Sequence, residues 1–543
     1  MHLTKQKKYL VLVLALVLFS AILVKVINQY RSKVKFYNFT TALEIKEIWK
    51  NYHNLSITTD IQVTRSISPY KELNANVVEA NQVVTDYDNI YSISNNQVVI
   101  TNVEKSEITD ELSFPFKPLF IYVTNDKLIV IGEADKKTHC FIYNKHSLEL
   151  YKSFDITSTY ITSRLIADEL FIVTSKLIES KDEVQERPNY HENQITKPIP
   201  YSNIYYINGT YSNNYVNIAK TNINNRVNLD IVSYLGLGQV IYFSDNHIYF
   251  AEEKYRKEGS SNQSIIIKFN QDLILSGAQE IKGYVLDQHS LNEYRDNLRV
   301  ATSSHNDTEK ESNNIYILNE KMKIIGKLED FSRGQEIQAA TFIKDKAYVE
   351  TFNILDPFYV ISLANERKPK IISSIKFDGY NTNLIPYDEN HIVAFGLILD
   401  QDKHATGLKV SLYDVTNPNK VNIKAKATFM YDEYNSAYSD VLYDCKALLL
   451  DYKRGYLGFP IIYWINEKQQ PAYYKQFYVV YKINDGFTQL GKISHYENSK
   501  SMNGSNDIKR GIIINQSLYT VSDRLIKENA LDGLELVNEI KLK

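Results

Sequence analysis

The side chains that could do chemistry in this chain are mostly carboxylates in short clusters. Asp86, Asp88 and Asn89 form one such cluster, and Asp400 and Asp402 form another. Oxygen ligands at this spacing can hold Ca²⁺. Both clusters also fall in predicted tight turns, where Asp and Asn bond their own backbone. The turn role is therefore the preferred interpretation, and calcium binding is the alternative.

Two further acidic pairs, Asp388-Glu389 and Asp432-Glu433, are adjacent in sequence, so nothing in them shows two carboxylates converging across a substrate. The chain has no G-x-S-x-G elbow, no G-x-x-x-x-G-K-[ST] loop and no G-x-G-x-x-G opening a helix. Its 11 His contain no H-x-H or H-E-x-x-H pair. We therefore predict no catalytic, cofactor-binding or metal residue, and leave the cofactor unassigned.

Two insertions are better candidates for function. Residues 180–213 form a long polar excursion, which is typical of a functional or a disordered loop. The second insertion, at 463–478, carries aromatic residues around a polar tip at 466–470. These aromatics either pack on a neighbouring element or form an exposed platform for a glycan or protein. The candidate partner surface is Tyr463, Trp464, Tyr473 and Tyr474.

Composition describes the setting of these residues. The chain has 543 residues and a net charge of −2, so no global basic field exists to hold nucleic acid. Its 42 Tyr and 22 Phe favour strands, because aromatic residues suit a pleated, half-buried surface. Cys140 and Cys445 each stand in an apolar strand context and are interpreted as buried thiols.

The N-terminus predicts membrane attachment. Residues 1–8 are basic, and residues 9–27 form an apolar run whose only charged residue is Lys25, long enough to span a bilayer if Lys25 snorkels. A signal peptide has the same layout, but small residues at positions −1 and −3 of a cleavage site are missing, since a cut after Ala21 would place Phe19 at −3. We expect an uncleaved anchor with residues 1–8 in the cytoplasm; a cleaved, secreted form is the alternative. Residues 28–76 should form a juxtamembrane segment with one short helix that begins near Thr41.

From Val77 to Lys543 one unit recurs instead of helical periodicity. A turn residue stands two positions before an apolar tetrad of strand type, followed by a hairpin to two more strands. The anchors are Asp88, Asp126, Asp168, Asn246, Asp296, Asp345 and Asn390, with weaker copies at Cys445 and Gln516. Differences between successive anchors are 38, 42, 78, 50, 49, 45, 55 and 71 residues, mostly near the roughly 40–50 residues of a propeller blade. An array of β-sandwiches would need linkers that the chain lacks.

The predicted fold class is therefore all-β: a single β-propeller over residues 77–543, behind the transmembrane and juxtamembrane helices. Nine anchors would mean nine blades, but propellers typically have four to eight. We expect about eight four-stranded blades, with seven to nine allowed, because a terminal unit could be incomplete or the last blade could share strands with the first.

Several stretches of the chain resemble the bacterial and archaeal secreted β-propeller-domain family, a family distantly similar to WD40-type propellers. The stretches are YITSRLIADELFIVT (160–174), PIPYSNIYY (198–206), HSLNEYRDNLRVATS (289–303), NNIYILNEKMKIIGKLEDFSRGQEI (313–337), ILDPFYVISL (354–363), IPYDENHIVAFG (385–396), GLKVSLYDVTNP (407–418) and YSDVLYDCKALLLD (438–451). The resemblance implies an extracytoplasmic propeller and supplies no activity. Where Cys445 stands, relatives often carry His in a YDHKA stretch.

The functional expectation is a membrane-anchored, extracytoplasmic binding or scaffolding module. Its partner would be a protein or a cell-envelope polymer, and nucleic acid is not expected. The alternative is a polysaccharide-active hydrolase or lyase, with acids from several blades gathered at the mouth of the propeller channel. Convergence of acids from three or more blades in one pocket would favour that alternative.

Overall fold

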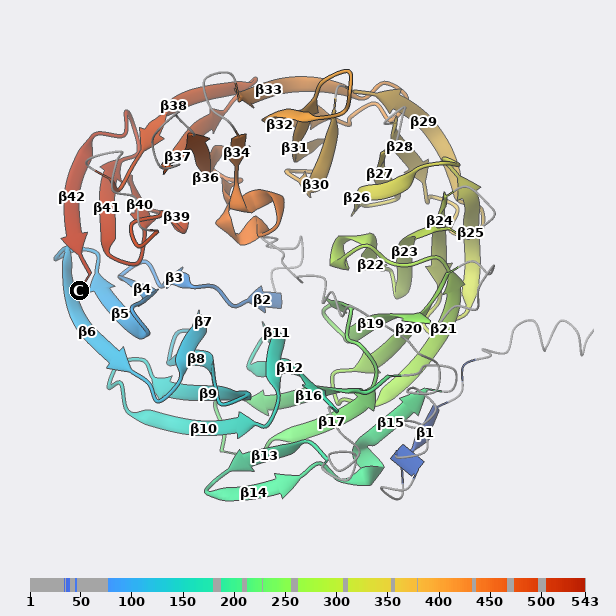
Figure 1. Ribbon diagram of the computed structural model, residues 1–543, viewed down its shortest axis with the longest axis horizontal. Coiled ribbons are helices and arrows are strands. Elements are labelled where there is room, and N and C mark those ends of the chain that lie inside the picture. Colours follow the sequence, from blue (N-terminus) through green and yellow to red (C-terminus); the bar gives the residue numbers. More distant parts are fainter. Residues whose placement is uncertain are drawn as a thin grey trace, which may run out of the picture.

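The computed structural model describes residues 34, 36–39, 44–45, 77–178, 187–207, 212–226, 228–254, 262–305, 311–352, 357–377, 379–431, 436–465, 473–496 and 504–542. The strands within these ranges form nine sheets. The sheets stand side by side in a closed ring around a central channel, which is the architecture of a β-propeller (Figure 1).

Each blade has four consecutive antiparallel strands, except for insertions in blades 3 and 8. Blade 1 comprises β3 (Val83–Thr85), β4 (Asn89–Ser94), β5 (Gln97–Asn102) and β6 (Glu107–Ser113), and blade 2 comprises β7 (Lys117–Val123), β8 (Lys127–Ala134), β9 (Lys137–Asn144) and β10 (Leu150–Ile156). Blade 3 comprises β11 (Thr159–Ile166), β12 (Glu169–Leu177), β16 (Asn214–Asn222) and β17 (Asp230–Leu235), and blade 4 comprises β18 (Val240–Phe243), β19 (His247–Lys254), β20 (Gln263–Asn270) and β21 (Leu275–Lys282).

Blades 5 to 9 complete the ring. Blade 5 comprises β22 (Leu291–Tyr294), β23 (Asn297–Ser304), β24 (Ser312–Leu318) and β25 (Ile324–Phe331), and blade 6 comprises β26 (Glu336–Ile343), β27 (Lys346–Phe352), β28 (Pro357–Ser362) and β29 (Lys370–Lys376). Blade 7 comprises β30 (Tyr380–Pro386), β31 (His391–Leu399), β32 (Ala405–Asp414) and β33 (Asn422–Met430), and blade 8 comprises β34 (Ser436–Tyr438), β35 (Leu449–Asp451), β36 (Tyr456–Ile465), β37 (Tyr473–Ile483) and β38 (Phe487–Ile493). Blade 9 comprises β39 (Arg510–Ile514), β40 (Ser517–Val521), β41 (Leu525–Ala530) and β42 (Leu536–Lys541).

The apolar tetrads are the second strands of the blades. Each of these strands is covered on both faces by the neighbouring blades, so both of its side-chain rows must be apolar. Residues 128–131 of β8, Leu-Ile-Val-Ile, illustrate this, since all four are fully buried. Eight of the nine anchors stand at the turn between the first and second strands of a blade.

The anchor assigned to blade 8 is wrong. Residues 445–447 form a short 3-10 turn, η5 (Cys445–Ala447), and the following strand, β35, is part of the innermost row of that blade. The turn that leads into the second strand, β36, ends at Gly455, whose φ of +67° suits glycine. The run Ala-Leu-Leu-Leu resembles the apolar start of a second strand because Ala447 packs in the core, although Ala447 is not in a strand.

The ring contains nine blades among the described residues, so the expected number of about eight is one too low, although it lies within the expected range. Among the described residues, blades 1 and 9 share no strand with each other. Blade 1 uses only β3–β6 and blade 9 only β39–β42. The two blades meet through packed side chains, among them Val83 and Val99 against Tyr519 and Val521. The ring is therefore closed by side-chain contacts, and neither alternative, an incomplete terminal unit or a shared strand, is found among the described residues.

The N-terminal part of the chain touches the ring at two places. Strand β1 (Phe36–Asn38) pairs with β15 at the outer edge of blade 3, and Ile45 is buried in the adjoining core. Strand β2 (Val77–Glu79) pairs with β11, the innermost strand of the same blade, and so lies inside the channel (Figure 1). The chain thus passes from the rim to the centre before blade 1 begins.

The expected segments 1–8 and 9–27, and most of 28–76, lie outside the described residues. Of the short helix expected near Thr41, the described part consists of Glu44 and Ile45, which are helical. No helix in the described ranges is long and apolar enough to span a bilayer.

The insertion at 180–213 extends two blades. Strands β13 (Asn189–Glu192) and β14 (Ile195–Pro198) form a hairpin that pairs with β10, the outer strand of blade 2. A 3-10 turn, η2 (Tyr201–Asn203), leads to β15 (Ile204–Ile207), which pairs with β17 of blade 3. In its described part the insertion covers two sheet edges that would otherwise expose unpaired backbone groups. It also provides the strand that holds β1.

Candidate functional site

A cavity of about 380 Å³ opens at the centre of the ring. It lies where β2, the inner strands of blades 3 to 6 and the β30–β31 turn approach one another. Its charged lining residues come from five parts of the chain and are Glu79, Arg164, Glu293, Arg299, Lys344 and Glu389. Its aromatic lining residues are Tyr242, Phe243, Tyr294 and Phe342. The size lies at the lower end of the roughly 300–1,000 Å³ that is typical of small-molecule sites.

Three short 3-10 turns reach into the channel and help to form its wall. The turn η3 (Gln288–Ser290) precedes the first strand of blade 5, and the Asp287 side chain caps it by accepting hydrogen bonds from two backbone N–H groups. In blade 8 the innermost row is split into β34 and β35, with η4 (Asp440–Leu442) and η5 between them. These turns place Gln288 and Lys446 opposite β2.

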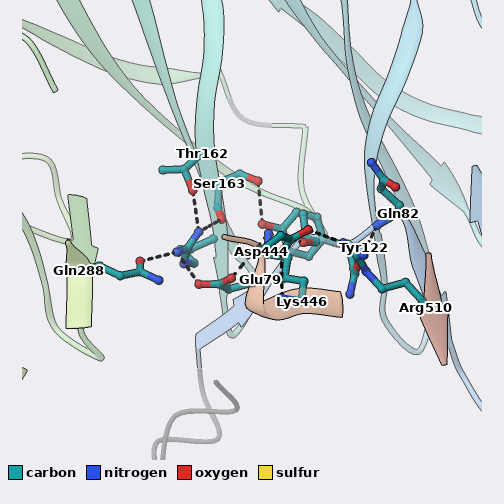
Figure 2. A network of polar contacts seen from close by, with 12 residues as sticks. Glu79, Gln82, Tyr122, Thr162, Ser163, Gln288, Asp444, Lys446 and Arg510 are labelled. Atoms are coloured by element: carbon teal, nitrogen blue, oxygen red, sulfur yellow. Dashed lines mark hydrogen bonds and ion pairs between the residues drawn. The ribbon is translucent and has the colours of Figure 1, made fainter. Parts of the chain in front are cut away.

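Glu79 on β2 is the centre of a buried polar network (Figure 2). Its Oε1 lies 2.5 Å from Arg164 Nη2, and its Oε2 lies 3.6 Å from Lys446 Nζ. Arg164 also donates to Thr162 Oγ1 and the Ser163 carbonyl, both at 2.7 Å. Burial lowers the pKa of Lys446, and the negative charge of Glu79 opposes that shift. One carboxylate thus joins the N-terminal strand to blades 3 and 8.

The network continues on both sides of Glu79. Gln288 Oε1 accepts a hydrogen bond from Arg164 Nη2 at 3.1 Å. On the other side, Lys446 Nζ donates to the Ala80 carbonyl at 2.9 Å, and Arg510 of blade 9 donates to Asp444 Oδ2 at 2.9 Å. Figure 2 shows Gln288 and Arg510 at opposite ends of this line of contacts. Four blades are therefore joined through the channel.

Glu293 forms the second acidic group of the cavity. Its carboxylate accepts hydrogen bonds from Ser244 Oγ and, at 3.0 Å, from Tyr249 Oη. It also lies 3.0 Å from His247 Nδ1. Burial opposes ionisation of Glu293, but these hydrogen bonds outweigh it and lower the pKa of the carboxyl group. Glu293 is thereby held as an anion.

Arg299 is the buried cation of the cavity wall, with 2% of its surface exposed. Its Nε donates to Asn292 Oδ1 at 3.0 Å, and Nη1 donates to the Lys344 carbonyl. The guanidinium lies 4.5 Å from the ring centre of Tyr294 and 5.0 Å from that of Phe342. Burial lowers the pKa of Arg299 to about 10, so the group stays charged at neutral pH. Among the described residues it has no carboxylate within 4 Å.

The third acid, Glu389, stands at the rim of the cavity. Its Oε2 lies 2.5 Å from Lys344 Nζ, and both side chains are more than half exposed. Its neighbour Asp388 instead meets His391 Nδ1 at 2.9 Å within its own turn. The pair Asp432-Glu433 lies outside the described residues. Acids from β2, blade 5 and blade 7 do line one pocket, but each of them has its own cationic or hydrogen-bonding partner.

The structure separates the four aromatic residues of the candidate partner surface into two faces, because side chains alternate along a strand. Trp464 pairs with Tyr474 across β36 and β37, and their ring centres are 5.1 Å apart. Trp464 is 44% exposed, whereas Tyr463 is 6% exposed and belongs to the core. Tyr473 pairs with the buried Ile465. The tip at 466–470 lies outside the described residues.

Tyr474 also takes part in a polar cluster with blade 9. Its hydroxyl donates to Asp507 at 3.0 Å, and the Tyr496 hydroxyl donates to the same carboxyl group at 2.8 Å. Burial raises the pKa of Asp507 although these hydrogen bonds act in the opposite direction. Trp464 and Tyr474 therefore form a small aromatic surface that the neighbouring blade supports. Its role as a partner surface stays a prediction.

The calcium alternatives appear as turn structures. Asp86 accepts hydrogen bonds from Asn89 N at 2.8 Å, Lys145 Nζ at 3.0 Å and Tyr91 Oη at 3.0 Å. Asp400 accepts from His404 N at 2.8 Å within its own turn. Across the part of the chain that the structure describes, no group of three or more His, Cys, Asp or Glu side chains is placed to hold a metal ion.

Both cysteines are buried, as predicted. Cys445 Sγ lies 3.2 Å from Asn383 Oδ1, so the group at this position contacts blade 7 and does not line the main cavity. Sequence reasoning did not find Glu79, Arg164, Glu293 or Arg299. Each stands alone in its own strand, and no local motif marks it. In the sequence they are distinguished only as charged residues in predicted strands, at positions where the strand pattern predicts buried side chains.

Comparisons with known proteins agree with this architecture. The family model described as Beta propeller domain matches residues 73–534. An uncharacterised protein of Archaeoglobus fulgidus is 29% identical over 301 residues, covering 55% of this chain and 42% of that protein. The uncharacterised protein MJ1554 of Methanocaldococcus jannaschii is 30% identical over 285 residues, covering 51% of this chain and 40% of that protein. The matches thus span about two fifths of the length of these curated relatives.

Solved structures show only weak similarity to this chain. A crystal structure of the eukaryotic initiation factor covers 84% of this chain and 96% of its own length, at 8% identity and a TM-score of 0.46. The family model covers most of the chain, including all nine blades at least in part. The chain therefore belongs to the Beta propeller domain family.

Proposed function

We propose that this protein is a binding or scaffolding propeller, held outside the cytoplasm by an N-terminal membrane anchor, whose partner is a protein or a cell-envelope polymer. The observation that carries the proposal is the state of the charged groups in the central cavity. Glu79, Glu293 and Glu389 are each neutralised or hydrogen-bonded by neighbours. Such fixed charges suit the recognition of a ligand.

The hydrolase or lyase alternative gains less support. A glycosidase needs a carboxyl group that is protonated near neutral pH and a second carboxylate across the bond to be cleaved. The hydrogen bonds to Glu293 lower its pKa, which is the opposite of what a general acid requires. Glu79 is bound to two cations, Arg164 on the cavity wall and Lys446 of blade 8.

A binding assay separates these two functions. The full chain, in detergent micelles, is mixed with cell-wall polysaccharide prepared from its own organism, and the polymer is sedimented. A scaffold that recognises the polymer is expected to sediment with it without releasing reducing ends or unsaturated sugars. Release of such products would establish the enzyme instead. If neither occurs, and crosslinking in the native membrane captures no partner protein either, the binding proposal fails.

The location is tested in intact cells. The proposal expects the propeller to remain with the membrane fraction and to be accessible to protease added outside spheroplasts. A variant lacking residues 9–27 should remain in the cytoplasm. Recovery of the wild-type chain from the cytoplasm, or its protection in spheroplasts, would contradict the anchored, extracytoplasmic arrangement. Recovery of a shortened chain from the medium would show the cleaved form.

A further inference from the structure

We propose that the central cavity binds a sugar that carries a carboxylate, a uronic acid residue, with Arg299 as the group that holds the acid. This inference rests on the proposed binding function and names the ligand class of the same site. The charged groups of the cavity wall differ in their partners. Every lining carboxylate has a cation or a set of hydrogen-bond donors of its own, whereas Arg299 is bound only by neutral oxygens.

The donors of Arg299 suit a carboxylate. A guanidinium has five N–H groups. Three of them donate to Asn292 Oδ1 and to the Lys344 carbonyl, so one N–H on each of Nη1 and Nη2 is left over. Two parallel N–H groups match the two oxygens of one carboxylate. The contacts with Tyr294 and Phe342 hold the guanidinium in place, so little side-chain freedom is lost on binding.

A second polar group of the wall also lacks a partner. Gln288 is 7% exposed, and its Nε2 is buried with no hydrogen-bond acceptor among the described residues. Its Oε1 is already used by Arg164, which fixes the orientation of the amide. An unpaired buried donor costs stability, and a ligand oxygen can recover that cost once Gln288 shifts toward the cavity that it lines. Sugars carry hydroxyl oxygens that can accept such a bond.

The remaining wall favours a sugar over a peptide side chain. Tyr242, Phe243, Tyr294 and Phe342 contribute apolar atoms to the wall beside the charged groups, although the first two and Phe342 are only 2–7% exposed. Ligand sites commonly combine such surface with a few fixed polar groups. The C–H face of a pyranose ring can pack on this surface while its carboxylate reaches Arg299. Because the direct hydrogen-bond partners of Arg299 are all neutral oxygens, its guanidinium can pair with one carboxylate, as in a uronic acid.

The test uses the full chain in detergent micelles and compares three probes by isothermal titration calorimetry. The probes are glucuronate, neutral glucose and N-acetylglutamate, which represents a peptide carboxylate. The inference expects glucuronate to bind at least about tenfold more tightly than either of the other two, since one charge-assisted pair is worth that factor or more. Equal binding of glucose, or stronger binding of N-acetylglutamate, would overturn it.

Substitutions in the cavity wall test whether glucuronate binds at Arg299. Arg299→Lys retains the charge but loses the two-pronged donor, and it should weaken glucuronate binding about tenfold or more. Arg295→Lys is the matched control, because Arg295 also stacks on Tyr294 but does not line the cavity. If Arg299→Lys fails to fold, Gln288→Glu serves in its place. This nearly isosteric change adds a negative charge to the wall and should also weaken glucuronate binding tenfold or more.

Unchanged affinity in a folded Arg299→Lys or Gln288→Glu variant would overturn the assignment. The outcome is separable from the proposed function. If the chain sediments with envelope polymer and glucuronate does not bind, the binding function stands and the uronic acid site is wrong.

Discussion

Glu79 and Arg164 are register partners in the β2–β11 ladder and also form a buried ion pair, with Glu79 Oε1 2.5 Å from Arg164 Nη2. Backbone and side-chain contacts thus hold the same N-terminal strand in the channel. Because Lys446 approaches the same carboxylate from blade 8, this strand also connects two blades that are far apart in sequence.

Removing the charge of Glu79 should destabilise the ring. Glu79→Gln leaves Arg164 and Lys446 as buried cations without a carboxylate, and breaking a buried pair typically costs about 3–5 kcal/mol. Urea unfolding measures the change in the free energy of unfolding. Lys446→Met in the same chain should recover part of the loss. Glu107→Gln, which removes an exposed pair with Lys105, is the control and should change stability by less than about 1 kcal/mol. Similar losses of stability for Glu79→Gln and Glu107→Gln would contradict the role of Glu79 in joining the N-terminal strand to blades 3 and 8.

The two thiols should be unreactive in the folded protein. Cys140 and Cys445 are both buried, and burial raises the pKa of each thiol well above its ordinary value. The thiolate is the reactive form. Iodoacetamide at pH 8 should therefore label neither residue in the native chain and both in urea, as read by mass spectrometry. Rapid labelling of either residue without denaturant would contradict the burial described here.

Acid should destabilise the protein partly through His495. Burial lowers the pKa of His495 to about 3, while the unfolded side chain titrates near its ordinary value of about 6.5. As the pH falls below about 6.5, the unfolded chain binds a proton that the folded chain does not. Stability therefore drops by up to ~1.4 kcal/mol per pH unit until the pH nears 3.

The contribution of His495 is isolated by a substitution. His495→Gln can still hydrogen-bond to Ser522 or Thr520 but does not titrate. Its free energy of unfolding, measured in urea from pH 7 to pH 4, should fall less steeply than that of the wild type. The difference in slope should approach ~1.4 kcal/mol per pH unit, which corresponds to the uptake of about one proton. His146→Gln, at an exposed position, should leave the slope unchanged. Parallel slopes for wild type and His495→Gln would show that the folded His495 binds protons normally.

The aromatic hairpin of blade 8 offers a test of its two faces. Tyr463→Ala removes a core side chain and should cost several kcal/mol of stability, since large-to-small aromatic changes in cores typically cost ~3–5 kcal/mol. Trp464→Ala removes a side chain that is 44% exposed and should cost much less. If this surface binds a partner, Trp464→Ala should reduce capture of that partner in crosslinking at unchanged thermal stability. Full capture by the Trp464→Ala variant would remove this surface from the candidates.

Much of the architecture was accessible from the sequence because a blade is a local object. Its four strands are consecutive, its turns are short, and its second strand is apolar on both faces. Eight of nine anchors therefore marked a true turn. The exception at Cys445 arose where the first strand of blade 8 is interrupted by turns that carry an apolar stretch. The count of about eight was drawn from typical propellers, although the nine anchors themselves matched the nine sheets.

The candidate site was not accessible in the same way. Glu79, Arg164, Glu293 and Arg299 lie on different strands, and their contacts exist only once the ring has closed. The aromatic residues at 463–474 were found, but their separation into two faces required the strand register. The composition of the insertion at 180–213 indicates a functional or a disordered loop, yet its described part pairs with the outer strands of blades 2 and 3.

By itself, then, the sequence determined the all-β repeat, the buried second strands, the buried thiols and the expectation of an N-terminal anchor, because period and turn chemistry act over a few residues. Only the tertiary structure decided how the ring closes, that β2 enters the channel, and which charges meet there. Those features depend on contacts between residues tens to hundreds of positions apart, such as Glu79 with Lys446, and no local pattern encodes them.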